Sequence, residues 1–529
     1  MNNQGVNNSL TLLLIYITLY PWYKAGLATG IGSVFFLLLG IFIFYFSLRD
    51  NFSRFNSILY FFVITTILLN IFSYFNPTFR NLNKEDLEYL EFNNLLIESD
   101  NVKKSKVLAD NISHVLKESE TNPREAIALF FHYKNIYIDK YGNKDSDKIV
   151  KFFNECEQRI LIKSNFFPSL FIADSDYFQR LFFFILNFFL CIFIYNSIQT
   201  REQCRKVFQF LFINTIILAV VGIYQKYTQR WNDDFIEILG VWNAPEPRYY
   251  FSTFSYKNHW SCFALVGIFS GIFITYEYIK RSGHLLLRSP IFLLYLISVF
   301  ISVFTIFYSG SRSGSFLIIL FFISFFLINL YFNKFKNKFL YIIFFVISFA
   351  SIFSFFAFSN VTKEMKTNTI NQAKSYKQGN LPLRVHLWKD AIRQIHGNIW
   401  FGYGYGAYTP SNPIYQSKIV REQRRVGLEN AHEKYVPLVA HVHNDILEFF
   451  LEFGLIGFFA LMTPWLILFS KSKIRTNSSL SRIFLVIVSI LFVYFVIDFP
   501  SRTPATMAIV SFFYGTALKY IYLRQSLVK

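Results

Sequence analysis

Long uninterrupted runs of apolar residues limit what this chain can fold into more than any other feature. Runs such as 178–198 and 289–310 extend for about 20 residues with almost no charge, which is the length a helix needs to cross the hydrocarbon core of a bilayer. The chain of 529 residues is 53% hydrophobic and holds 68 Phe, and its mean hydropathy is +0.34. A soluble domain is less apolar than this. We therefore predict an all-α polytopic membrane protein.

Twelve such runs predict about twelve transmembrane helices. The first is the weakest, because it is short and ends at Pro21-Trp22. The expected spans are 9–22, 26–48, 55–75, 178–198, 206–227, 261–279, 289–310, 313–332, 338–359, 444–469, 481–500 and 503–523.

The basic residues of the short connecting segments predict the orientation. Six segments together hold 17 Lys or Arg against two acids, Asp50 and Glu202. The positive-inside rule places these segments and both termini in the cytoplasm. Because both termini lie on the same side, the number of spans must be even. The six segments are 49–54, 199–206, 280–289, 333–338, 471–482 and 524–529.

The long polar segments then face outward and divide the chain. The first, 76–177, has helical periodicity and is nearly balanced in charge, with 14 basic and 17 acidic residues. It reads as a helical extracytoplasmic insertion that serves packing or partner docking. The second, 360–443, is a long extracytoplasmic loop. The expected regions are 1–75 with spans 1–3, 76–177, 178–359 with spans 4–9, 360–443, and 444–529 with spans 10–12.

The formal charge of +19 does not indicate nucleic-acid binding, because many of the basic residues are orientation signals in short loops. The four cysteines form no CxxC pair, so neither a disulfide framework nor a zinc site is expected. The first residues have no basic residue ahead of their apolar run. They therefore predict the approach to a first span rather than a cleavable signal peptide.

Two short outward stretches concentrate cations at the ends of spans. The turn Tyr308–Ser315 carries Arg312 between small residues, which favours anion binding over an ordinary turn with a snorkelling Arg. The stretch 248–260 carries Arg248, Lys257 and His259 among aromatic residues. An interfacial aromatic belt with snorkelling cations would explain this stretch equally well.

The loop 360–443 has 12 basic and five acidic residues and holds five histidines. One amphipathic helix is expected in it, and Arg384 and Arg393 lie close to its apolar face. A flexible aromatic turn, Gly402–Gly406, follows. The excess of positive charge suggests an anionic ligand. The expected apolar face consists of Leu387, Trp388, Ala391, Ile392 and Ile395.

At the end of this loop, His441 and His443 precede a long apolar helix. Asn444 is placed to cap that helix, and Glu448 falls near its first turn. Imidazole titrates near neutral pH, so His443 can orient or deprotonate a hydroxyl, although it is also compatible with an ordinary loop histidine. Whether His441 shares the role stays open. Acids on one helix face also allow a divalent-metal site, but their first reading is that of helix-terminal acids: Asp445, Glu448 and Glu452.

These stretches, in this order, resemble the bacterial O-antigen ligase and polymerase superfamily. Three motifs carry the resemblance over roughly 200–470: Ser311-Arg312-Ser313-Gly314, the pattern from Arg384 to Gly406, and His443-Asn444-x-x-Leu447-Glu448 followed by Gly454–Gly457. The stretch from Arg248 to His259 resembles the segment ahead of the family's middle spans. The insertion 76–177 departs from the simplest members and leaves the subfamily open.

The resemblance implies a membrane glycosyltransferase in the bacterial inner membrane with a periplasmic active face. It would move a glycan from a polyprenyl-pyrophosphate carrier such as undecaprenyl pyrophosphate, with inversion and without a metal or other cofactor. Arg312 and His443 are the expected catalytic residues. Arg248, Arg384 and Lys257 are expected to bind the pyrophosphate, and His441, Asn444 and Glu448 to support them.

The acceptor stays open. A ligase would use lipid A-core and act in lipopolysaccharide biosynthesis, a polymerase would join repeat units, and an O-oligosaccharyltransferase would modify protein; we favour the ligase. A transporter or flippase is a rival class, but the span interiors lack the ionisable and broken segments typical of transporters. A scaffold that recruits partners through 76–177 is a further alternative.

Overall fold

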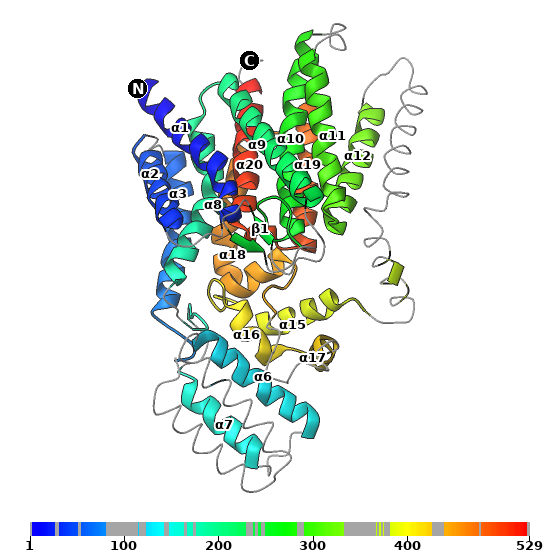
Figure 1. Ribbon diagram of the computed structural model, residues 1–529. Helices are drawn as coiled ribbons and strands as arrows, with labels where there is room; N and C mark the ends of the chain where they lie inside the picture. The colour runs from blue at the N-terminus through cyan, green and yellow to red at the C-terminus, as the bar shows by residue number, and fades with distance from the viewer. Residues whose placement is uncertain are drawn as a thin grey trace. The chain divides into compact units, whose positions relative to one another are not determined.

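A computed structural model of the chain describes most of the predicted helical segments (Figure 1). Arg248 and the expected span 338–359 lie outside the described residues, as does most of 81–122. The described residues are 3–26, 31–50, 54–80, 123–141, 148–162, 167–172, 176–228, 236–238, 242–244, 249–282, 290–332, 381–425, 439–474 and 478–525, with the single residues 115, 367, 370, 371 and 374.

The chain divides into two units, and each is built from segments far apart in the sequence. The first unit comprises residues 1–60, 182–374 and 463–529. The second comprises 61–181 and 375–462. The predicted insertion and most of the predicted outer loop, from residue 375 onward, therefore fall in the same unit.

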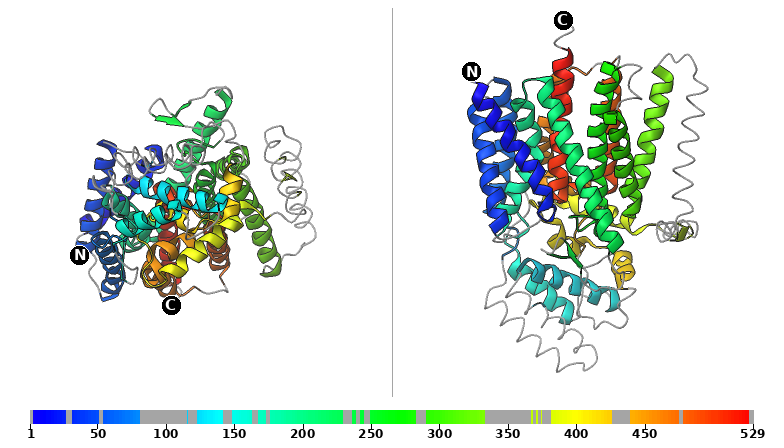
Figure 2. Two further views of the ribbon diagram at one scale, coloured as in Figure 1. Left: turned by 90° about the horizontal axis from the view of Figure 1, so that it is seen from below. Right: turned by 45° about the horizontal axis from the view of Figure 1, so that its top comes forward.

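The first unit consists of long apolar helices that run alongside one another in Figure 1 and in the right view of Figure 2. Helix α10 packs against α9, α11, α12, α19 and α20. The helices are α1 (Asn3–Leu19), α2 (Ile31–Asp50), the start of α3 (Arg54–Tyr74), most of α8 (Tyr177–Ser197), α9 (Arg201–Thr228), α10 (Lys257–Ser282), α11 (Pro290–Tyr308), α12 (Arg312–Phe332), the end of α18 (Asp445–Lys471), α19 (Ser479–Ile497) and α20 (Pro504–Gln525).

Small residues let these helices approach closely, as is common between helices in membranes. A Cβ added to Gly515 of α20 would lie 2.4 Å from the carbonyl oxygen of Cys191 in α8. One added to Gly267 of α10 would lie 2.3 Å from the Thr215 hydroxyl of α9. Two short strands, β1 (Ile236–Ile238) and β2 (Trp242–Ala244), pair antiparallel in the segment between α9 and α10. The other named elements of the described residues are helices.

Eleven of the twelve expected spans coincide with a described helix. Among the described residues, seven helices are long and apolar enough to cross a membrane, and three further helices have shorter apolar stretches. The chain is thus a membrane protein with all-helical spans, and the number twelve stays a prediction.

The start of α1 and the end of α20 lie at the same end of the first unit (Figures 1 and 2). Helix α20, with 22 residues, is about 33 Å long at 1.5 Å per residue. The junction of α19 and α20 is therefore at the opposite end, and Ser313 at the start of α12 contacts Asp498 there. Arg312 lies at the end of this unit away from the chain termini, while the side of the membrane it faces stays a prediction.

The second unit is built around one apolar core that the insertion and the outer loop share. Its members come from the insertion, from the loop and from the start of α18. Phe130, Phe153, Leu387, Tyr408, Val442 and Leu451 are examples. The helices are the rest of α3, α6 (Pro123–Tyr141), α7 (Lys148–Ile160), the start of α8, α15 (Leu383–Gly397), α16 (Tyr408–Tyr415), α17 (Lys418–Arg425) and the first part of α18.

Helix α18 is broken at Gly454, although its sequence predicts a continuous span. Gly454 has φ 63° and ψ −173°, a conformation essentially restricted to glycine. The break lets the segment after α15 bond to the helix backbone, since Tyr403 N–H donates to Leu451 O at 2.9 Å and Leu455 N–H donates to Ile399 O at 2.8 Å. Gly402, with φ 69°, lies against the Glu452 backbone in the same place.

Candidate functional site

Arg312 is the first residue of α12 and is exposed in the first unit. The Ser311 hydroxyl accepts the Gly314 N–H at 3.2 Å and so caps the helix. The Lys257 ammonium lies 3.6 Å from the position that a Cβ on Gly310 would take. The structure therefore brings two of the predicted anion-binding cations to one turn, where the positive end of the α12 dipole also favours an anion.

A network of buried polar side chains supports the turn that carries Arg312. The Ser311 hydroxyl donates to Asn258 Oδ1 at 2.8 Å, and Asn258 Nδ2 donates to Asp498 Oδ2 at 2.5 Å. Asp498 also accepts from the Ser313 hydroxyl at 3.4 Å. The Tyr494 hydroxyl donates to the Asn258 carbonyl at 2.6 Å. A buried carboxylate is costly unless hydrogen-bonded, and here it fixes the residues on both sides of Arg312.

Asp498 and Tyr494 were missed by the sequence reasoning. The only available signal was a lone acid near the end of the apolar run 481–500, which by itself indicates a helix end. Its partner Asn258 is 240 residues away in the sequence. The partnership therefore could not be predicted from spacing.

Hydrogen bonds and ring contacts hold the described residues around Lys257 in place. His259 is buried, hydrogen-bonds the Thr503 hydroxyl through Nδ1, and packs edge-on against Phe499 with ring centroids 4.9 Å apart. Lys257 Nζ lies 5.7 Å from the centroid of the Tyr249 ring, a cation–π contact. Burial raises the pKa of Tyr250 to about 12, so this phenol is neutral near pH 7.

In the second unit, α15 contacts the histidine loop. Trp388 Nε1 donates to the carbonyl of His443 at 3.4 Å, and Arg384 lies one turn before Trp388 on a partly exposed part of the helix. The predicted apolar face is correct for the buried Leu387 and Ala391. It is wrong for Ile392, which is 45% exposed. Asp390 and Gln394 are buried instead, because each accepts or donates hydrogen bonds inside the unit.

The two loop histidines are held differently. His441 Nδ1 lies 3.0 Å from Glu448 Oε1, and Glu448 Oε2 accepts the Val442 N–H at 3.1 Å. Glu448 is 1% exposed, whereas the His441 side chain is 28% exposed. His443 has φ 58°, the left-handed region that few non-glycine residues adopt. This turn directs the chain so that His441 faces back onto the helix that follows.

Asn444 caps α18 as predicted, since its Oδ1 accepts the Leu447 N–H at 3.1 Å. The acids that follow it, Asp445, Glu448 and Glu452, are all buried. The prediction of simple helix-terminal acids is therefore incomplete, because Glu448 bonds an imidazole and a loop N–H rather than only the helix start. Within the described ranges, no group of three or more His, Cys, Asp or Glu is arranged to hold a metal ion.

The family model for O-antigen ligase matches residues 297–462. The match confirms the predicted resemblance to the O-antigen ligase superfamily. No curated protein matches the chain.

The O-antigen ligase match covers the α12 start, α15 and the histidine loop, and so includes Arg312, Arg384, His441 and His443. It leaves out Lys257, the insertion and Asp498. The match supports the expectation of a glycosyl-transferring membrane enzyme of the O-antigen ligase or polymerase type.

Proposed function

We propose that the protein transfers a glycan from a polyprenyl-pyrophosphate carrier to an acceptor hydroxyl outside the inner membrane, in the manner of an O-antigen ligase. The observation that carries this proposal is the pair of cations, Arg312 and Lys257, at the N-terminus of α12. Arginine binds phosphate oxygens in a bidentate way and stays charged. Such a site suits the two phosphates of the donor.

In the proposed reaction, the acceptor oxygen attacks C1 of the first sugar as the bond from C1 to the pyrophosphate oxygen breaks. The electron pair leaves with the pyrophosphate, and Arg312 and Lys257 stabilise the charge that develops there. These cations would supply the charge that a metal ion supplies in other transferases. We assign Arg248 and Arg384 to the same donor, and the reaction inverts the configuration at C1.

The proton of the acceptor hydroxyl passes to an imidazole. We assign this role to His443 and give the neighbouring His441 a supporting one. The contact with Glu448 orients the His441 ring. A carboxylate that hydrogen-bonds an imidazole orients it as a base, and here Glu448 contacts His441 rather than His443. The two histidines must therefore be tested separately.

The assay is glycan transfer by the purified protein in detergent, with a lipid-pyrophosphate-linked glycan and no ion gradient. We expect Arg312→Ala and His443→Ala each to lower the rate by about 100-fold or more. His441→Ala should lower it less. His396→Ala and Lys389→Ala are matched controls, because both side chains are exposed on α15.

The outcomes separate the alternatives. Normal transfer by Arg312→Ala and His443→Ala proteins would refute the site, and no transfer by the wild-type protein would favour a transporter or a scaffold. Transfer should persist in EDTA, and its loss would refute metal independence. Gene deletion distinguishes the acceptors. Loss of all long glycans from the lipid core indicates a ligase, and a core that carries a single repeat unit indicates a polymerase. Unchanged lipopolysaccharide indicates a protein acceptor.

A further inference from the structure

We propose that the insertion 76–177 is a positioning element for the loop that carries His441 and His443, and that Asp139 of α6 is its main polar contact. The insertion would act on the reaction only through the loop. The activity part of the test rests on the proposed function, whereas the structural part does not.

Helix α6 is a core helix rather than a docking surface. Its eight consecutive residues Ala126–Tyr133 are all buried, including His132. A helix that docks a partner keeps an exposed apolar face, and these residues leave none. The stretch 126–133 of α6 therefore offers no exposed apolar face to a partner.

Helices of the outer loop pack against α6. Ala126, Phe130 and Tyr133 belong to the same apolar cluster as residues of α15, α16 and α17. Helix α16 packs directly on α6. The cluster also contains Val442, which separates the two histidines. Residues that share a close-packed core transmit displacement to one another.

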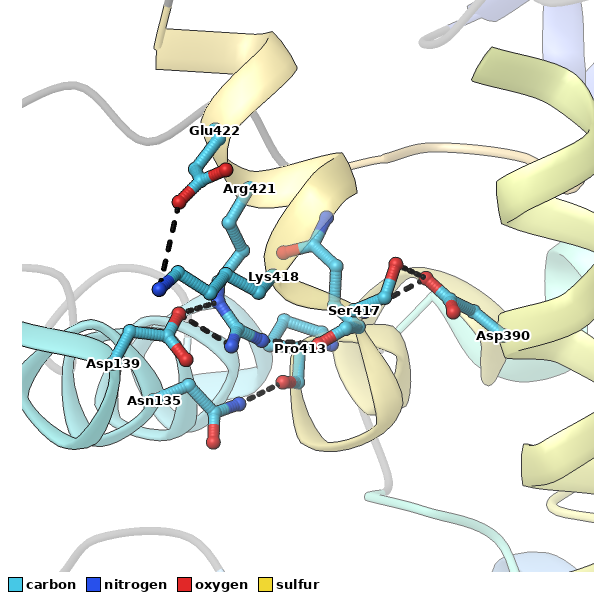
Figure 3. A network of polar contacts seen from close by, with 9 residues as sticks. Asn135, Asp139, Asp390, Pro413, Ser417, Lys418, Arg421 and Glu422 are labelled. Atoms are coloured by element: carbon cyan, nitrogen blue, oxygen red, sulfur yellow. Dashed lines mark hydrogen bonds and ion pairs between the residues drawn. The ribbon is translucent and has the colours of Figure 1, made fainter. Parts of the chain in front are cut away.

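Polar contacts fix the register of this packing (Figure 3). Arg421 of α17 forms a forked ion pair with Asp139, with Nε at 2.6 Å and Nη2 at 2.5 Å from Oδ2. The same guanidinium donates to the Gln416 carbonyl. Asn135 donates to the carbonyl of Pro413 near the end of α16, a carbonyl that has no partner within the helix.

From these helices the contacts continue to the histidine. The Ser417 N–H and hydroxyl donate to Asp390 of α15 at 2.9 and 3.1 Å (Figure 3). Helix α15 carries Trp388, whose indole donates to the His443 carbonyl. Hydrogen bonds and packed helices therefore connect α6 to the backbone of the proposed catalytic residue. Arg384 stands on the same helix and depends on the same support.

The first experiment measures amide hydrogen exchange of the full-length protein in detergent. Asp139→Asn should raise exchange in 416–425 and in 439–448, because Arg421 loses its charged partner. The exchange of α9 and α10 should not change. Glu155→Gln is the control, since Glu155 forms an exposed pair with Lys151 on α7 at 3.9 Å. The double variant Asp139→Arg with Arg421→Asp should show more protection from exchange than Asp139→Arg alone.

The second experiment measures transfer by the same variants. A displaced catalytic group lowers kcat, so we expect Asp139→Asn to lower kcat by roughly 10-fold. The KM for the donor should change less, because Arg312 and Lys257 do not depend on this support. If Asp139→Asn fails to fold, Asn135→Ser, which removes a single amide contact, is measured instead.

The proposal is overturned if Asp139→Asn, or Asn135→Ser in its place, leaves exchange in 416–425 and 439–448 at the wild-type level. A double variant with no restored protection would also contradict it, because a direct pair must respond to reversal. A wild-type protein without transfer activity would refute the proposed function only. The exchange data would still decide whether the insertion positions the loop.

Discussion

The turn that carries Arg312 rests on polar side chains, whereas the loop that carries His443 rests on an apolar core and one buried carboxylate. Beneath Arg312, a serine, an asparagine, a tyrosine and an aspartate form a connected set of hydrogen bonds. In the loop, Val442 enters the apolar cluster, and Glu448 contacts the His441 ring and accepts the Val442 N–H.

The difference matches the two proposed tasks. A cation that holds a leaving pyrophosphate must keep its place while charge develops, and preformed dipoles and hydrogen bonds provide that rigidity. An imidazole that moves a proton needs an orienting contact and access to the acceptor. Both residues lie at the start of a helix. The turn that carries Arg312 is held mainly by hydrogen bonds, whereas the loop that carries His443 is held mainly by apolar packing. Substitutions at four positions test this contrast.

The largest effect is expected on the loop side, at Gly454. Alanine there would adopt a conformation essentially limited to glycine, and its Cβ would lie 2.4 Å from Phe401 N. Strain and overlap together should cost about 3 kcal/mol or more. Thermal unfolding in detergent measures the loss. The neighbouring exposed Ile456→Ala is the control, and a wild-type melting temperature for Gly454→Ala would show that the break in α18 is dispensable.

In the turn that carries Arg312, Gly314→Ala should cause the next largest loss of stability. Its Cβ would lie 2.4 Å from the Ser261 Cβ in α10, so α10 and α12 must separate at a cost of about 2–3 kcal/mol. The matched variant is Gly310→Ala, where the nearest atom is Lys257 Nζ at 3.6 Å and only the positive φ opposes alanine, by about 1–2 kcal/mol. Equal losses would contradict close packing at Gly314.

Asp498→Asn tests the polar support directly. It replaces a charged acceptor of the Asn258 amide by a neutral one, and should lower stability by about 2 kcal/mol. Transfer should fall more than stability explains, because Arg312 loses its fixed place. Measurement of donor KM and kcat on the folded fraction checks this. Unchanged kinetics would mean that the network supports folding alone.

Tyr494→Phe should have the smallest effect of the four. It removes one hydrogen bond, from the phenol to the Asn258 carbonyl, and keeps the ring in place, so about 1 kcal/mol is expected. The change is read from the melting temperature, with transfer close to wild type. A loss as large as that of Asp498→Asn would show that the network acts as a unit rather than as separate bonds.

The helices themselves were predictable because the signal is local. Apolar runs predicted eleven of the described helices within a few residues, and Asn444 was correctly placed as the cap of α18. The resemblance to O-antigen ligases rested on three short motifs, around Arg312, from Arg384 to Gly406 and around His443, and the family match supports it. Each span, cap and motif is formed by residues that are near one another in the sequence.

Other features were not predictable, for identifiable reasons. The break at Gly454 depends on the backbone of 399–403, about 50 residues earlier, which packs where the Cβ would be. The exposed Ile392 and buried Asp390 reverse part of the expected amphipathic face, because Ser417 and Arg393 satisfy the carboxylate. Periodicity counts apolar residues and does not register such partners.

The sequence by itself determined that the chain is a helical membrane protein with cations and histidines at helix ends, since length, hydropathy and capping are properties of continuous segments. The tertiary structure alone decided that Asp498 supports Arg312, that Glu448 orients His441, and that the insertion shares its core with the histidine loop. The first and third join residues far apart in the chain, and the second requires the left-handed turn at His443. Such contacts arise only when the whole unit is packed.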